Sequence, residues 1–121
     1  MIKAPCTPPT PRQFFIDGLK HELSGQGQKA INCYRAAAFL GETEAMRNVS
    51  RCYRHGIGVQ KHVREEIIWL KKAAEAGDLL SMFEYAVLFD KGERVNRNFL
   101  TAKMWYKAAL VSLMNRPIFE Q

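Results

Sequence analysis

Apolar side chains recur along the chain with the three- and four-residue spacing that marks one face of an α-helix. This spacing predicts six helices, over about residues 14–23, 29–39, 44–55, 63–76, 79–91 and 98–114. Segments containing glycine follow several of these helices, and glycine ends a helix readily because its backbone tolerates a positive φ. The chain is therefore predicted to be all-α, with three helix-turn-helix hairpins over about residues 12–40, 42–77 and 78–114.

The second and third hairpins repeat one another at an interval of 36 residues. The matching pairs are Gly41 and Gly77, Met46 and Met82, Tyr53 and Phe89, Gly56 and Gly92, Val59 and Val95, Trp69 and Trp105, and Ala73 and Ala109. A fixed interval of this length is typical of stacked helical repeats. We therefore expect an α-α superhelix, a short solenoid in which each hairpin packs on the next.

The two ends of the chain are predicted to lie outside this repeat domain. Four prolines between Pro5 and Pro11 remove amide donors and fix φ, so residues 1–11 are expected to form an extended, non-helical tail. The repeat domain is assigned to residues 12–116, and residues 117–121 form a C-terminal tail. Asn98 is predicted to cap the last helix, because its side chain can accept from a first-turn amide.

The middle hairpin carries the clearest motif in the chain. It reads Ala45-x3-Val49-Ser50-x2-Tyr53-x2-Gly56-x-Gly58-Val59, followed by Trp69-x3-Ala73-Ala74-x2-Gly77. This pattern resembles the Sel-1-like repeat, a relative of the tetratricopeptide repeat. The third hairpin departs from it at Arg94, in place of the second glycine, and at Leu113, in place of the closing glycine. The first hairpin looks more like a plain tetratricopeptide unit.

The resemblance implies packing roles for the positions that match the family pattern. Small residues allow helices to approach closely, and the tryptophan fills the space between hairpins. The structural positions assigned in this way are Tyr53, Gly56, Gly58, Trp69, Ala73, Gly77, Phe89, Gly92, Trp105 and Ala109. The resemblance also implies a non-enzymatic role in protein binding, because similar proteins act as adaptors, assembly factors and bacterial effectors or immunity proteins.

Charge suggests what such a protein would bind. The sequence has 18 Lys and Arg against 12 Asp and Glu, a net charge of +6, which favours an acidic partner. Arg47, Arg51 and Arg54 recur along one helix face, although an ordinary solvated face is the alternative interpretation. The resemblance to Sel-1-like repeats implies that the leading helix of each hairpin lines the concave side of the stack, where partners bind. The predicted partner-binding residues are Arg47, Asn48, Arg51, Arg54, Phe83 and Val87, the last two standing 36 residues after Arg47 and Arg51.

Two further hypotheses remain beside this one. One is a bacterial immunity or inhibitor protein that neutralises a toxin, and the other is a basic repeat protein that binds nucleic acid. The second is disfavoured because exposed aromatics are not interleaved with the basic residues. The leading helix of the third hairpin is apolar nearly all round and needs a cover. Pro117-Ile118-Phe119, a partner protein or a second copy in a homodimer would serve.

Catalytic, metal and membrane signatures are lacking in the sequence. Cys6, Cys33 and Cys52 have no paired Cys-x2-Cys spacing, so neither a metal site nor a cofactor is expected. Buried free thiols are the main interpretation, and a Cys33–Cys52 disulfide is left open. No apolar run approaches membrane-spanning length and no signal peptide is recognised, so a cytoplasmic protein without membrane contact is expected.

Overall fold

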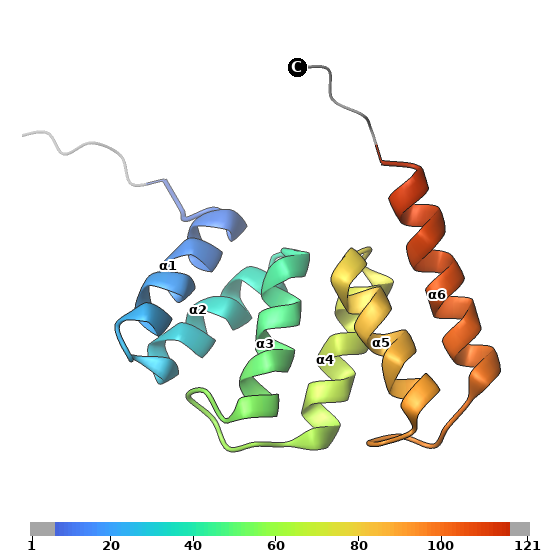
Figure 1. Ribbon diagram of the computed structural model, residues 1–121. Helices are drawn as coiled ribbons and strands as arrows, with labels where there is room; N and C mark the ends of the chain where they lie inside the picture. Colours follow the sequence, from blue (N-terminus) through green and yellow to red (C-terminus); the bar gives the residue numbers. More distant parts are fainter. Residues whose placement is uncertain (1–6, 117–121) are drawn as a thin grey trace, which may run out of the picture.

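The computed structural model describes residues 7–116, and six helices account for most of them (Figure 1). They are α1 (Pro11–Leu23), α2 (Gly27–Phe39), α3 (Thr43–His55), α4 (Val63–Glu75), α5 (Leu79–Lys91) and α6 (Phe99–Met114). Each helix packs chiefly against the helices before and after it, so the pairs α1–α2, α3–α4 and α5–α6 stack in sequence order. The three hairpins form an arc with α1 and α6 at its two ends (Figure 1). The predicted all-α helical repeat fold is confirmed.

Glycine and side-chain caps set the ends of these helices. Gly56 and Gly92 follow α3 and α5 with left-handed φ values of 75° and 70°. The Asn98 side chain accepts a hydrogen bond from the Thr101 amide at 3.0 Å, so this predicted cap is confirmed. The boundary at Pro11 was predicted wrongly, because α1 begins there. Proline is tolerated in the first turn, where its missing amide costs no helical hydrogen bond.

The loop between α3 and α4 touches the start of α2 through two glycines. A Cβ atom added to Gly58 would lie 2.3 Å from the Gly27 carbonyl oxygen, and one added to Gly27 would lie 2.9 Å from the Gly58 nitrogen. Gly58 also has a φ of 72°. The backbones of the first and second hairpins therefore approach more closely here than any residue with a side chain would allow.

Two clusters of buried side chains form the core. The larger joins the first two hairpins and contains Phe15, Ala30, Ile31, Tyr34, Ala37, Ala38, Ala45, Val49 and Cys52. The smaller joins the second and third and contains Leu70, Ala74, Tyr85 and Leu88. Trp69 packs partly buried against the first cluster, and Trp105 packs partly buried against the second. The repeated tryptophans thus each contact the interior of one hairpin junction.

The last helix differs from the others in length and in its outer surface. It has 16 residues where each other helix has 13, and it runs through Leu113 and Met114, the counterparts of Gly77 and Asp78. Gly77 has a φ of 99° and Asp78 caps α5, so the turn that follows α4 has no equivalent after α6. Large apolar side chains are exposed on α6. The residues predicted to cover the third hairpin, 117–119, lie outside the described part of the chain.

Candidate functional site

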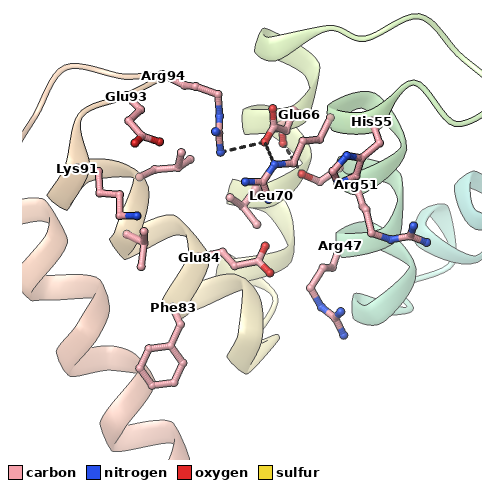
Figure 2. A pocket seen from close by; sticks show the side chains of 14 residues that line it. Arg47, Arg51, His55, Glu66, Leu70, Phe83, Glu84, Lys91, Glu93 and Arg94 are labelled. Atoms are coloured by element: carbon pink, nitrogen blue, oxygen red, sulfur yellow. Dashed lines mark hydrogen bonds and ion pairs between the residues drawn. The ribbon is translucent and has the colours of Figure 1, made fainter.

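A groove of about 300 Å³ opens between α3 and α5, and we call it the α3–α5 groove (Figure 2). Residues of α3 form one wall, residues of α5 form the other, and Glu66 and Leu70 of α4 lie between them. Arg94, from the loop between α5 and α6, closes one end. The two walls are the leading helices of successive hairpins, because stacking of the repeats sets α3 and α5 on either side of α4.

Five of the six predicted partner-binding residues line this groove. Arg47, Arg51 and Arg54 come from α3, and Phe83 and Val87 come from α5. Asn48 does not line it: only 7% of its surface is exposed. The prediction placed Asn48 beside the arginines because it follows Arg47 in sequence, yet consecutive residues of a helix point about 100° apart. Asn48 therefore belongs to the interior of the stack.

Two of the arginines are already engaged by carboxylates of other hairpins. Arg47 Nε donates to Asp78 Oδ2 at 2.8 Å, and only 9% of the Asp78 side chain is exposed. Arg51 donates to both oxygens of Glu22, with Nη1–Oε2 at 2.9 Å and Nη2–Oε1 at 2.7 Å. The sequence predicted a basic stripe available to a partner. Arg47 and Arg51 instead have structural partners that join α3 to α5 and to α1.

The third arginine, Arg54, shares the carboxylate of Glu66 with Arg94, and neither Glu66 nor Arg94 was predicted to belong to the site. Glu66 is 3% exposed, and its Oε2 lies 3.6 Å from Arg54 Nε and 3.1 Å from Arg94 Nη2. Figure 2 shows the Arg94 guanidinium extending from the α5–α6 loop toward Glu66, with the two interactions dashed. The helix that carries Glu66 is held against α3, because the Ser50 hydroxyl donates to the Glu66 backbone carbonyl at 2.7 Å.

Glu84 adds an acidic group to the α5 wall. Partial burial raises the pKa of its carboxyl, although the positive charges of Arg47 and Arg54 act in the opposite direction. No described residue forms an ion pair with Glu84 within 4.0 Å. The groove therefore combines apolar side chains, guanidinium groups and a carboxylate, a mixture suited to recognising a polypeptide segment.

The described residues offer no arrangement typical of catalysis or metal binding. Within residues 7–116, no three His, Cys, Asp or Glu side chains are close enough to hold a metal ion. Cys33 and Cys52 are both free thiols, so the disulfide that the sequence left open is not formed. Burial raises the pKa of Cys52 to about 11 and also raises that of Cys33, which disfavours the thiolate needed for nucleophilic attack. Cys6 lies outside the described residues.

The fold and the sequence repeats define this chain as a helical repeat protein. It matches the Sel1 repeat family over residues 18–41, 43–78 and 79–110, and it therefore belongs to that family. The first match covers part of the first hairpin, so this hairpin also belongs to the Sel1 repeat family, although its sequence looks more like a plain tetratricopeptide unit. No curated protein sequence matches the chain.

Solved structures support the same assignment. The chain is similar to a Sel1 repeat protein from Oxalobacter formigenes, with 27% identity and a TM-score of 0.79 over 86% of this chain and 44% of that one. It is also similar to c5321, a protective antigen of uropathogenic Escherichia coli with an SLR fold, with 27% identity and a TM-score of 0.75 over 87% of this chain and 23% of that one. The chain thus spans less than half the length of either structure.

Proteins of the Sel1 repeat family typically mediate protein–protein interactions and generally act as non-catalytic scaffolds. In the part of the chain described here, no helix is both long and apolar enough to cross a membrane.

Proposed function

We propose that this chain is a non-enzymatic adaptor or sequestering protein that binds a segment of another protein in the α3–α5 groove. The observation that carries the proposal is the groove itself, where five of the predicted binding residues meet around about 300 Å³ of accessible space. A cavity of this size, lined by apolar and charged groups, accommodates the side chains of a short peptide. Val87 remains 36% exposed there, so its apolar surface is available to a partner.

The proposed segment is partly apolar and partly acidic. The groove is lined by five cationic side chains, Arg47, Arg51, Arg54, Lys91 and Arg94, and by three carboxylates, Glu66, Glu84 and Glu93. This leaves a formal excess of two positive charges on the lining. Asp78 and Glu22, which do not line the groove, neutralise the charges of Arg47 and Arg51. Recognition of acidic groups is therefore expected from particular residues of the groove, not from a uniformly basic surface.

Site-specific photocross-linking tests the groove directly. We expect a chain carrying p-benzoylphenylalanine in place of Val87 to form a discrete adduct with a protein in native lysate. The matched control carries the same group in place of Ile68, which is 39% exposed but lies outside the groove. Adducts of equal yield from both positions, or none from Val87, would contradict the proposal.

The same experiment separates the rival functions. An adduct with a toxin would make the chain a bacterial immunity or inhibitor protein, which is one form of sequestration. Loss of the adduct after nuclease treatment would favour nucleic acid. Self-association through α6 is opposed by charge, because α6 carries Lys103 and Lys107 and no acidic residue, so a symmetric pairing would bring lysines together. We therefore expect a partner of different sequence.

A further inference from the structure

The positive charge of the α3–α5 groove is unevenly compensated. Arg47 and Arg51 each have a carboxylate of their own, in Asp78 and Glu22. Arg54 and Arg94 share the single carboxylate of Glu66, at 3.6 Å and 3.1 Å. Two guanidinium groups on one carboxylate leave one positive charge in excess at this end of the groove.

Arg94 also has an unused donor. Its Nε is the one buried side-chain nitrogen or oxygen among residues 7–116 that has no hydrogen-bond partner. A buried donor without a partner is unfavourable. The Arg94 side chain as a whole is 26% exposed, so an incoming group can reach the exposed part of its guanidinium. Arg54 is 47% exposed at its side chain, so it can also reach a ligand. A carboxylate suits both residues, because guanidinium groups bind carboxylates with strong, charge-assisted hydrogen bonds.

The repeat register shows that this cluster is particular to one place in the stack. Glu66 stands 36 residues after Ala30 and 36 before Ala102, and both alanines are buried. Arg94 stands 36 residues after Gly58, which packs tightly against Gly27. Repeat packing therefore accommodates an alanine and a glycine at these positions. The acid and the base depart from the pattern together, and they meet in the groove.

Other charged groups near the cluster reduce its excess only in part. Lys91 and Glu93 both line the groove and their charges cancel. Glu84 is close enough to interact electrostatically with Arg54 and Glu66, so it offsets part of the excess, but it forms no ion pair with either arginine of the cluster. Leu70 and Val87 also line the groove, and they offer apolar surface beside the cationic cluster.

We propose that the Arg54–Glu66–Arg94 cluster is a carboxylate-binding subsite, which receives an acidic side chain of the partner while a neighbouring apolar side chain packs on Leu70 and Val87. This inference rests on the proposed function and assigns the chemistry of the partner segment. It places Arg94, a residue outside the repeat pattern, at the point that selects for acidic partners.

A peptide titration followed by NMR tests the subsite. The probes are acetyl-Leu-Glu-Leu-amide and its isosteric control, acetyl-Leu-Gln-Leu-amide, added to the ¹⁵N-labelled full chain. We expect the Glu peptide to shift the Arg94 Nε–H and Val87 amide resonances with a Kd of about 1–10 mM, and the Gln peptide to bind about tenfold more weakly. The Val87 amide reports on binding in every variant. The Arg94→Gln variant should lose this preference, as should Arg54→Gln if the first variant fails to fold. Lys103→Gln, which removes an exposed cation of α6 outside the groove, should keep it.

Several results would overturn the subsite. They are equal binding of the two peptides, binding of neither, or a preference that survives both arginine substitutions. A third probe, acetyl-Leu-Leu with a free terminal carboxylate, would overturn the assignment to a side chain if it alone bound. These failures are distinct from failure of the proposed function. A partner cross-linked at Val87 without any preference for Glu retains the groove and rejects the subsite, whereas the converse retains the subsite and rejects the partner.

Discussion

Arg51 and Glu22 form a two-hydrogen-bond ion pair that joins α3 to α1 across the first hairpin junction. Glu22 also accepts from the Tyr34 hydroxyl at 2.6 Å, so one carboxylate connects three helices. This pair changes how the groove should be tested. Charge reversal at Arg51 would break a contact within the stack, and any loss of partner binding would then report on folding as well as on recognition.

The Arg51–Glu22 pair predicts a specific dependence of stability on pH. Hydrogen bonds from Arg51 lower the pKa of Glu22 below its ordinary value of 4.5. A carboxyl with a lower pKa in the folded state contributes stability that is complete above the unfolded pKa. That stability is lost as the pH falls through the folded pKa. Glu22→Gln should therefore lower the free energy of unfolding at pH 7 by about 1 kcal/mol, since the pair is partly exposed to solvent.

Urea denaturation of the wild-type chain and of Glu22→Gln, at pH values from 7 to 3, measures this effect. The difference between the two should shrink as the solution becomes more acidic. Glu75→Gln is the matched control, because Glu75 is exposed and forms no ion pair or side-chain hydrogen bond among the described residues. A difference that stays constant over this pH range would exclude the assigned role of the ion pair.

Arg47 and Arg54 should differ sharply in their contribution to stability. Asp78 is buried and uses one oxygen to accept from Arg47 Nε, from the Ser81 amide at 3.1 Å and from the Ser81 hydroxyl at 2.6 Å. Arg47→Ala leaves this carboxylate without its counter-ion and should cost about 2–3 kcal/mol. Arg54→Ala should cost less than about 1 kcal/mol, because Arg54 is half-exposed. Chemical denaturation of both variants decides the matter, and equal losses would refute the distinction.

The contact between Gly58 and Gly27 predicts a strong effect of adding one methyl group. Gly58→Ala places a Cβ against the Gly27 carbonyl and also strains a positive φ, so it should destabilise the chain by at least about 3 kcal/mol. Gly25→Ala is the control, because Gly25 has a similar φ of 76° and open space around its Cα. It should cost about 1 kcal/mol. Thermal or urea melts that rank the two variants together would show that the close approach is unimportant.

Trp69 should contribute less than a fully buried tryptophan. Its ring packs partly buried against the first core cluster, and the Lys72 ammonium lies 4.4 Å from the ring centroid. Trp69→Ala should lower the free energy of unfolding by about 2–3 kcal/mol, below the 3–5 kcal/mol typical of a fully buried aromatic. Ile68→Ala, at an exposed neighbouring position, should change it by less than about 1 kcal/mol. Denaturation curves that coincide for wild type and Trp69→Ala would be inconsistent with this packing.

The helices were predictable because periodicity, glycine and capping residues act locally. Gly56, Gly92 and Asn98 mark helix ends through the backbone of their own turn, and the structure places them as expected. The walls of the groove followed from the repeat register together with the family resemblance. Phe83 and Val87 stand where Arg47 and Arg51 stand in the preceding hairpin, and the resemblance implied that these leading helices line the concave side.

The ion pairs were not predictable in the same way. Arg51 and Glu22 are 29 residues apart and meet only because the first two hairpins stack. Glu66 and Arg94 did leave a signal, because Glu66 stands between Ala30 and Ala102 in the aligned repeats and Arg94 replaces the glycine found at Gly58. The two residues lie in different hairpins. Their pairing therefore becomes evident only when the stacking of the hairpins is known.

At Leu113 and Met114 the chain stays helical where the corresponding residues of the second hairpin turn and begin the next one. A glycine at the first position and a capping aspartate at the second, as in Gly77-Asp78, reverse the chain and begin the next leading helix. The turn before α3 shows which of the two residues matters more, because Gly41 also has a positive φ whereas the Glu42 side chain makes no capping hydrogen bond. A designed array that adds a hairpin in this register would therefore need a glycine in place of Leu113, with the aspartate as an additional cap.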